Sequence, residues 1–299
     1  MIRIGFIGVN HGHEGVFLDL FNGNHRHEGF PLLREAKVVG ISGFEQFETW
    51  KELGKQYSLK VVSPKASDVI EQCDGVMVLS YDYSYAENYV DYHVELAIAA
   101  LEAGKPTFVD KPMANQMKNI QTMFHRSAQL GVPLLCASSM RTDPALTYVR
   151  DHLSDVGQVR FARCTLTNGT LIGYGIHGAE MIQEVFGQGI KRIKAEAHGA
   201  VNIVHVDYGD DKAVILEHFP CQKYIKQLQV FGTEGALDSQ NLEPVYPRVH
   251  YEFLLSEYIQ MVKEKKSPVK KEDTIESHGI VIGAELSLKE RRVVELATF

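Results

Sequence analysis

The chain has 299 residues, of which 44% are hydrophobic and 23% charged, as in a globular protein long enough for two domains. A formal net charge of −7 excludes the basic field that attracts nucleic acid or an anionic membrane. The N-terminus shows no signal-peptide pattern, and no apolar run approaches the ~20 residues of a membrane span. The four cysteines form no Cys-x-x-Cys pair, so we expect mostly buried free thiols in a cytoplasmic protein.

The first half of the chain alternates short apolar runs with helical segments. A run over residues 2–8 predicts a buried first strand, and an amphipathic stretch from His13 predicts a helix to about Phe21. Further strands are expected at 37–41, 61–62, 75–80, 107–109 and 132–137, with helices at 47–56, 66–72, 93–104 and 117–130. This alternation predicts a parallel sheet with helices on both faces.

The turn after the first strand has the context of a dinucleotide fingerprint, which is a strand, a glycine-bearing turn and a helix. Counted from Gly8, the pattern Gly-x-Gly-x-x-Gly needs glycines at positions 10 and 13, where the chain has Asn10 and His13. Asn tolerates positive φ, Gly12 allows close approach to a phosphate, and the helix N-terminus attracts anions. We expect a pyrophosphate-binding turn that includes His11; the alternative is a tight turn without a ligand.

The ends of two other strands bear on the cofactor. After the second strand come Ser42 and Gly43, where dinucleotide enzymes often carry an acid for the ribose hydroxyls. The acid is absent and no nearby arginine selects NADP, so the choice between NAD and NADP stays open. Ser80 and Tyr81 follow the 75–80 strand, and the tyrosines at 81, 83 and 85 either pack a loop or form a wall of the ligand site.

A short strand, residues 107–109, ends in Asp110-Lys111-Pro112. Pro112 cannot donate to a sheet and disfavours helical geometry at Lys111, so the strand stops there. Lys111 therefore lies at the carboxyl end of a strand, the edge where open α/β sheets bind ligands. The alternative is a solvated or salt-bridged lysine in a turn.

The second half of the chain is richer in strands. After a helix at 144–153, strands are expected at 159–167, 193–197, 201–208, 212–218 and 225–232, with helices at 176–186, 251–265 and 273–288. The alternating pattern and the turn at 208–211 predict a largely antiparallel sheet. We expect a domain boundary near Ser138 to Arg141, which gives domains 1–139 and 140–299.

Several segments together resemble the glucose–fructose oxidoreductase / inositol dehydrogenase (Gfo/Idh/MocA) family. They are the alanine-rich segment 93–106 with the following Asp110-Lys111-Pro112, the segment 230–237, the helix from Tyr251 and the segment 291–296. The resemblance implies an N-terminal Rossmann NAD(P)-binding domain and a C-terminal α+β domain with an open-faced sheet for substrate binding and oligomerisation. It also implies NAD or NADP as cofactor, a sugar- or polyol-like substrate, and a homodimer or homotetramer.

The resemblance also implies site residues, and the chain departs from it in places. His177 matches the family's catalytic histidine, but Gly173 stands where the family has an aspartate four residues earlier. Glu180, on the same helical face, is a candidate to orient the His177 ring instead. The expected cofactor contacts are Gly8, Asn10, His11, Gly12, Ser42, Ser80, Tyr81, His93, Asp110 and Lys111, and the expected substrate contacts are Lys111, Tyr174 and His177.

Oxidising a secondary alcohol requires a base for the hydroxyl proton and a cofactor for the hydride. An imidazole suits the base, and an ammonium group stabilises the developing alkoxide. We expect His177 to take the proton and Lys111 to position the oxygen, with Asp110 or Glu180 as an electrostatic partner. The alternative is a catalytically silent ligand-binding or sensor protein, favoured by Gly173 and the altered fingerprint.

Four histidines near the N-terminus, His11, His13, His25 and His27, form two His-x-His pairs. A spacing of two points side chains apart on a helix. No nearby cysteine or carboxylate cluster completes a ligand set. We expect no metal site, and no nucleic-acid or membrane partner.

Overall fold

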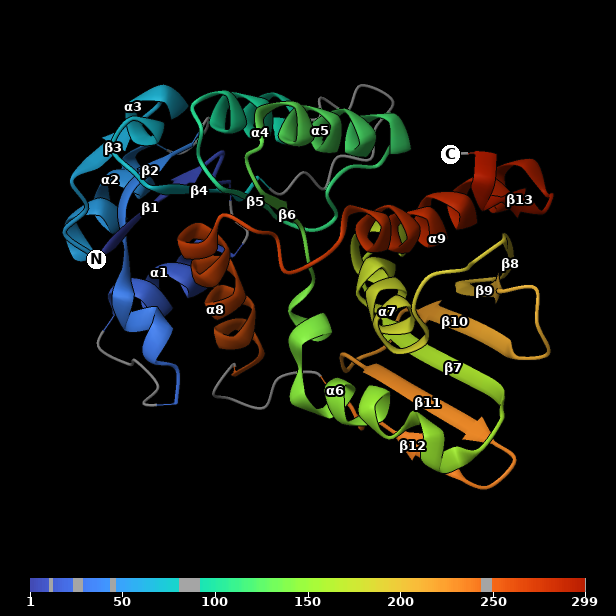
Figure 1. The fold of residues 1–299 in the computed structure, drawn as a ribbon. Helices are drawn as coiled ribbons and strands as arrows, with labels where there is room; N and C mark the ends of the chain where they lie inside the picture. Colours follow the sequence, from blue (N-terminus) through green and yellow to red (C-terminus); the bar gives the residue numbers. More distant parts are fainter. Residues whose placement is uncertain (11–12, 24–28, 44–46, 81–91, 243–248, 299) are drawn as a thin grey trace. The chain divides into compact units, whose positions relative to one another are not determined.

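The computed structural model describes residues 1–10, 13–23, 29–43, 47–80, 92–242 and 249–298. The chain folds into two compact units (Figure 1). Unit 1 comprises Met1–Ala114, Asn119–Cys136 and Tyr251–Val269; unit 2 comprises Asn115–Lys118, Ala137–His250 and the residues from Lys270 on. The division predicted at 139/140 put the 251–265 helix in the second domain, whereas the structure groups it with unit 1.

Unit 1 is built on a six-stranded sheet in the order β3-β2-β1-β4-β5-β6, in which every neighbouring pair is parallel. The strands are β1 (Ile2–Ile7), β2 (Ala36–Ser42), β3 (Val61–Ser63), β4 (Gly75–Val78), β5 (Thr107–Val109) and β6 (Leu134–Leu135). The strand order reverses direction between β1 and β4, so the carboxyl ends of these two strands form the topological switch point.

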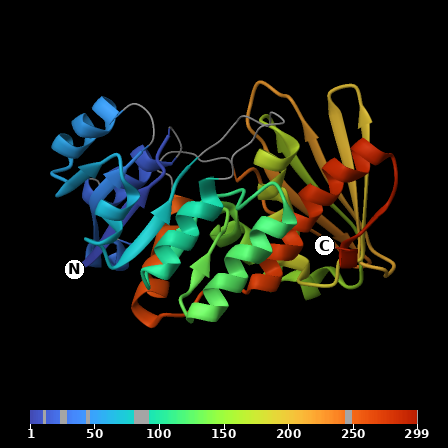
Figure 2. The ribbon, with the colours of Figure 1, turned by 90° about the horizontal axis from the view of Figure 1, so that it is seen from above.

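Helices cover both faces of this sheet, with α4 and α5 on one side and α1 and α8 on the other (Figures 1 and 2). The helical elements are α1 (Glu14–Asn22), η1 (Pro31–Glu35), α2 (Phe47–Gln56), α3 (Ala66–Ile70), α4 (Tyr92–Glu102), α5 (Met117–Leu130) and α8 (Val249–Glu264). Aromatic contacts explain why α8 belongs to unit 1. The rings of Phe17 and Tyr251 lie 5.5 Å apart, and those of Phe108 and Tyr258 lie 6.0 Å apart.

Unit 2 is built on a seven-stranded sheet in the order β12-β11-β7-β10-β9-β8-β13. Among the strand pairs of this sheet that the structure describes, only β7–β10 is parallel, so the sheet is largely antiparallel as expected. The strands are β7 (Val159–Thr167), β8 (Arg192–His198), β9 (Val201–Asp207), β10 (Ala213–Phe219), β11 (Lys226–Gly232), β12 (Ala236–Asp238) and β13 (Val294–Glu295).

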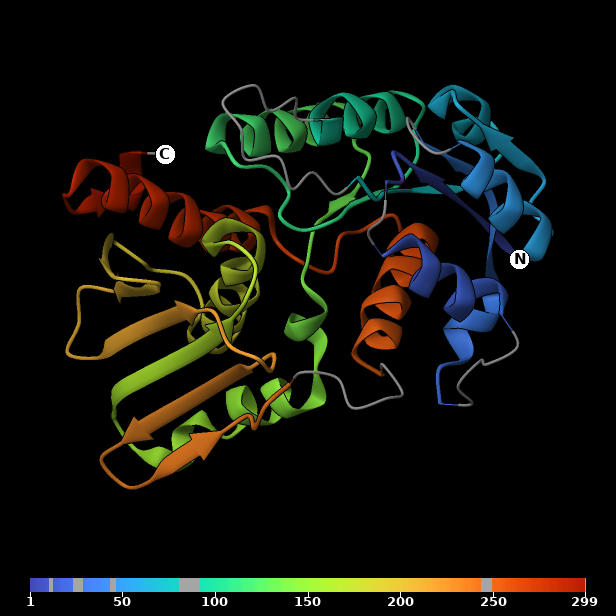
Figure 3. The same cartoon turned by 180° about the vertical axis from the view of Figure 1, so that it is seen from behind.

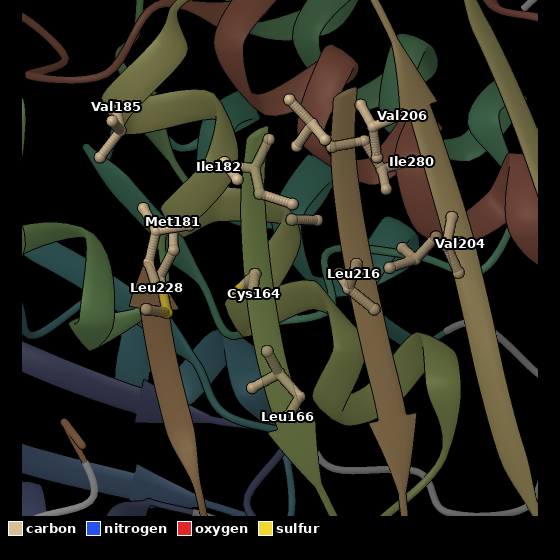
Figure 4. Packing of buried hydrophobic residues seen from close by; sticks show 14 of the residues in the cluster. Cys164, Leu166, Met181, Ile182, Val185, Val204, Val206, Leu216, Leu228 and Ile280 are labelled. Carbon is tan, nitrogen blue, oxygen red and sulfur yellow. The ribbon is translucent and has the colours of Figure 1, made fainter. Parts of the chain in front are cut away.

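Two long helices, α7 (Leu171–Phe186) and α9 (Lys271–Glu290), lie on one face of this sheet (Figure 3). The core of unit 2 fills the space between them and the strands. Figure 4 shows Met181 and Ile182 of α7 and Ile280 of α9 facing apolar side chains of β7, β9, β10 and β11. The remaining helical elements are η2 (Ser139–Thr142), α6 (Pro144–Asp151), η3 (Leu153–Val156) and η4 (Leu296–Thr298).

Helix α7 begins five residues before the predicted start at residue 176. Thr170 caps its N-terminus, because the Thr170 hydroxyl accepts a hydrogen bond from the Gly173 amide at 3.0 Å. Gly173 and Gly175 have low helix propensity, but burial and the cap outweigh it. His177 consequently lies within the helix rather than at its start.

Two predicted strands are shorter in the structure by two residues or more. β4 ends at Val78 rather than Ser80, and β6 covers only Leu134–Leu135 of the predicted 132–137. Cys73, Cys136 and Cys164 are buried free thiols, and Cys221 is exposed. Within the described residues, no helix combines the length and apolarity needed to cross a membrane.

Candidate active site

A glycine and a buried serine hydroxyl lie at the switch point of unit 1. Gly8 follows β1 with φ +70°, and a Cβ added there would lie 2.5 Å from Cδ1 of Leu96. Ser80, after β4, is 3% exposed, and its Oγ has no hydrogen-bond partner within the described residues. Position 8 thus requires glycine on two counts. A buried hydroxyl without a partner beside it is what an absent ligand would satisfy.

The side chain of Trp50 fills the space next to the end of β2. Ser42 is buried, and its carbonyl accepts a hydrogen bond from the Val9 amide at 3.0 Å. A Cβ at Gly43 would lie 2.5 Å from Nε1 of Trp50 and 2.6 Å from the Val9 carbonyl oxygen. The acid missing from position 43 therefore has no room in this arrangement. Asn10 lies half-buried after β1, whereas His11, Gly12, Tyr81 and the other tyrosines of the 81–91 loop lie outside the described residues.

Asp110 and Lys111 follow β5 and are both buried, with 2% and 4% exposure. Oδ1 of Asp110 accepts a hydrogen bond from the Lys111 amide at 2.8 Å. Its Oδ2 lies 2.7 Å from Nδ1 of His13. Burial by itself raises the pKa of Asp110, but the charge and hydrogen bond of His13, with the Lys111 ammonium and amide, lower that pKa overall. Asp110 is therefore held as a carboxylate.

His13 takes a part in unit 1 that the sequence reasoning missed. The sequence suggested only that His13 replaces a fingerprint glycine and belongs to a His-x-His pair. In the structure its ring stacks on Phe17 at 5.3 Å and lies 5.3 Å from the Tyr251 ring. This packing directs Nδ1 to Asp110, 97 residues away. No sequence spacing signals a pair so far apart.

His93, an expected cofactor contact, is buried in α4 with both ring nitrogens against backbone carbonyls. Nε2 lies 2.6 Å from the oxygen of Ser80, and Nδ1 lies 3.0 Å from the oxygen of Met113. A carbonyl only accepts, so a neutral imidazole donates to one of these two oxygens at a time. His93 joins the segments that follow β4 and β5, which makes it a support for this edge of the sheet.

In unit 2 the His177 ring is held by a serine. Nδ1 of His177 lies 2.6 Å from Oγ of Ser138, and the two residues are 5% and 0% exposed. Tyr174 makes an edge-on contact with His177 at 5.6 Å and stacks on Tyr224 at 5.7 Å. The ammonium group of Lys226 lies 5.9 Å from the Tyr174 ring centre. His177 and Tyr174 therefore share one polar, aromatic environment.

Glu180 reaches the His177 environment through Ser138. Its Oε2 accepts a hydrogen bond from the Ser138 amide at 2.9 Å and lies 3.9 Å from the Arg141 guanidinium. Arg141 is 7% exposed; it also pairs with Glu184 at 3.0 Å and bonds to Gln183. Sequence reasoning placed Glu180 correctly on the histidine's helical face but did not foresee Ser138. Residues 138 and 177 are too far apart in the sequence for their hydrogen bond to appear as a local sequence pattern.

No group of three or more His, Cys, Asp or Glu side chains in the described part of the chain is arranged to hold a metal ion. The doubly wound sheet, the glycine at its switch point and the charged Asp110–Lys111 pair define a dinucleotide-binding α/β protein of the Rossmann type.

Comparison with known proteins agrees with this class. Residues 2–138 match the GFO_IDH_MocA model, described as an oxidoreductase family with an NAD-binding Rossmann fold. The chain is 21% identical over 348 residues to the myo-inositol 2-dehydrogenase of Thermotoga maritima, with 99% of this chain and 98% of that protein covered.

Solved structures resemble the chain along its whole length. One is scyllo-inositol dehydrogenase from Lactobacillus casei with bound NAD(H) and scyllo-inositol, with a TM-score of 0.81, 15% identity and 99% of each chain covered. Another is a putative NADPH-dependent oxidoreductase from Desulfitobacterium hafniense, with a TM-score of 0.80, 16% identity and coverage of 99% and 98%. Residues 2–138 thus match the Gfo/Idh/MocA oxidoreductase family, in agreement with the resemblance, and the similarity to solved structures confirms the predicted fold class.

Proposed function

We propose that the protein is an NAD(P)-dependent dehydrogenase that transfers a hydride between nicotinamide and a secondary alcohol or carbonyl of a polyol or sugar. The observation that carries this proposal is the buried, charged Asp110–Lys111 pair at the carboxyl edge of the sheet whose switch point contains Gly8. Relatives named for myo-inositol and scyllo-inositol support a polyol as the substrate class.

The residues at the switch point fit a dinucleotide. Gly8 leaves the backbone open after β1, and the orphaned hydroxyl of Ser80 is available to a phosphate or ribose oxygen. Asn10 follows β1 and Ser42 ends β2, so both lie at the same carboxyl edge of the sheet. When bound, the cofactor supplies hydride acceptance and donation at nicotinamide C4. The family description supports NAD, and the missing acid at Gly43 leaves NADP as a second candidate.

Lys111 acts as the group that positions and polarises the substrate oxygen in this proposal. A buried ammonium is costly unless a negative charge compensates it. The adjacent Asp110 carboxylate supplies that charge in unit 1. An ammonium preorganised in a site with little water stabilises developing alkoxide charge far better than one in solvent.

His177 acts as the proton acceptor and donor. Its Nδ1 is held by Ser138, so proton exchange with the substrate falls to Nε2. Tyr174 flanks the ring and is proposed to contact the substrate. Glu180, behind Ser138, supplies negative charge on the same side.

A polyol panel tests this function. Purified protein is incubated with inositols, sugars and sugar alcohols plus NAD⁺ or NADP⁺, and reduced cofactor is followed by absorbance. We expect turnover with at least one polyol. Lys111→Ala and His177→Ala should each lower kcat by about 10²–10⁴-fold while the protein still binds cofactor.

Lys105→Ala is the matched control, because Lys105 lies just before the same strand and bonds to the Cys73 carbonyl at 2.7 Å. It should retain activity. A wild-type protein that binds NAD(H) but turns over no polyol would instead support the silent, ligand-binding alternative, to which the glycine at position 173 points.

A further inference from the structure

The helix that carries His177 provides no acid one turn before it. Position 173 is glycine, and its amide is used by the Thr170 cap. The hydrogen bond to Nδ1 comes from Ser138, immediately before η2 and 39 residues earlier in the chain. The orientation of the ring therefore depends on a group outside α7.

Ser138 is itself fixed at three points. Its amide donates to Oε2 of Glu180 at 2.9 Å, and its hydroxyl oxygen accepts from the Met140 amide at 3.1 Å. The third point is the 2.6 Å contact with His177. The side chain is fully buried, so no bulk water competes for the hydroxyl. A group held this firmly fixes the ring that it contacts.

A serine hydroxyl differs from the carboxylate that commonly accepts a hydrogen bond from a histidine ring. It has one proton to donate and two lone pairs to accept with, whereas a carboxylate only accepts. The Met140 amide occupies one lone pair. The second lone pair remains to accept a hydrogen bond from Nδ1–H of His177.

We propose that Ser138 is the positioning residue of His177, and that its hydroxyl oxygen accepts a hydrogen bond from Nδ1–H, which holds the ring in the tautomer whose Nε2 is free of a proton and can take one from the substrate. The inference rests on the proposed function of His177 as proton acceptor. During alcohol oxidation the substrate O–H bond breaks and its proton goes to Nε2. The carbinol C–H bond breaks and its electron pair leaves with the hydride to nicotinamide. Nδ1–H donates to Ser138 in the neutral ring and in the resulting imidazolium alike, and release of the Nε2 proton to solvent restores the neutral base.

The test compares side chains of equal shape with and without a hydroxyl. Ser138→Thr keeps the hydroxyl, and Ser138→Val removes it at nearly the same volume. Ser138→Ala removes it without added bulk. Ser139→Ala is the neighbouring control, since the carbonyl of Ser139, which the substitution keeps, accepts the bond from the Thr142 hydroxyl at 3.1 Å. We expect Ser138→Ala and Ser138→Val to lose about tenfold in kcat, as for one hydrogen bond. The KM for the cofactor should stay unchanged, and Ser138→Thr should retain most of the activity.

A second readout follows the ring directly. The ¹⁵N signals of His177, assigned by their loss in His177→Gln, should show a hydrogen-bonded Nδ1 throughout a pH titration of the wild type. That signature should persist in Ser138→Thr and vanish in Ser138→Ala and Ser138→Val. It is measurable even if no polyol is turned over, so failure of the proposed activity and failure of this inference are distinguishable.

A free Nδ1 in the wild type would overturn the proposal, even if the substituted proteins do not fold. Equal kcat losses in Ser138→Thr and Ser138→Val, with folding intact, would overturn it as well. Wild-type kcat in Ser138→Ala would have the same meaning.

Discussion

Asp110 is a carboxylate that the protein buries and yet keeps charged. Its desolvation alone would favour the neutral acid, but His13 and Lys111 more than offset this and lower its pKa. An unfolded aspartate has a pKa of about 3.9. The depressed pKa means that ionised Asp110 contributes stability above that value, and that the contribution is lost as pH falls through the folded-state pKa.

The Asp110→Asn substitution tests this contribution. It removes the negative charge beside the buried Lys111, so we expect a loss of about 3–5 kcal/mol in the free energy of unfolding at pH 7. The loss should shrink as the solution is acidified, because the wild-type carboxylate is then also neutral. Urea unfolding measured from pH 7 to pH 3 gives both the loss in the free energy of unfolding at pH 7 and its decrease in acid.

The control for this prediction is Asp74→Asn. Asp74 also has a lowered pKa, through its bonds to Arg3, but both side chains are substantially exposed. Its loss should cost at most about 1 kcal/mol and should fall with added salt. Equal costs at the two positions would show that burial of Asp110 is not what makes its charge important.

Gly8 gives a second prediction at the level of a single residue. Gly8→Ala combines a left-handed φ with a clash against Leu96, so it should both destabilise unit 1 and abolish NADH binding. Gly104→Ala is matched, because Gly104 has φ +71° with open space around it. That change should cost only about 1–2 kcal/mol and leave NADH affinity unchanged. Calorimetric titration of both variants checks the difference.

Hydrophobic periodicity was enough to predict some helices and strands and was not enough for others. The ranges of α2, β5, α5 and β7 were predicted to the residue, because turn residues bound each run. The start of α7 was wrong because a cap and tertiary packing outweighed the glycines. Lys111 was predicted at a strand end from Pro112 alone. Ser138 and His13 were not predicted, since their bonds join residues far apart in sequence.

The glycine at position 178 brings α7 close to its sheet. A Cβ there would meet side chains of Leu166, Cys164 and Leu216 together. Gly178→Ala should therefore destabilise unit 2 by about 1–3 kcal/mol, although alanine is the better helix former. Gly175→Ala, whose nearest neighbour is a leucine methyl at 3.1 Å, should be close to neutral. Thermal unfolding of the pair measures the contrast, and a stabilised Gly178→Ala would show that the helix can move away.

For the molecule as a whole, the sequence predicted a Rossmann domain followed by a largely antiparallel domain, and both are present. It did not predict that α8 returns to unit 1, because a helix pattern does not show which core its apolar face joins. The expected catalytic residues come from both units, Lys111 from the first and His177 from the second.

We also predict a homodimer or homotetramer that forms through the open face of the unit 2 sheet. Helices α7 and α9 lie on one face of the sheet (Figure 3). Leu228 and Val230 of β11 belong to the core on that face, so Phe231 lies on the other face, where it is 38% exposed and stacks on Phe161. Phe231→Glu should dissociate the assembly. Light scattering at micromolar concentration checks this prediction, and a monomeric wild type would contradict it.

The central claim is that the turn after β1 still binds a nicotinamide dinucleotide without the full set of fingerprint glycines. Fluorescence and calorimetric titration of the purified protein with NADH and NADPH tests it most directly. We predict micromolar binding of at least one of them, lost in Gly8→Ala and retained in Gly104→Ala. Binding of neither cofactor by a folded wild-type protein would contradict the claim and remove hydride transfer as the function.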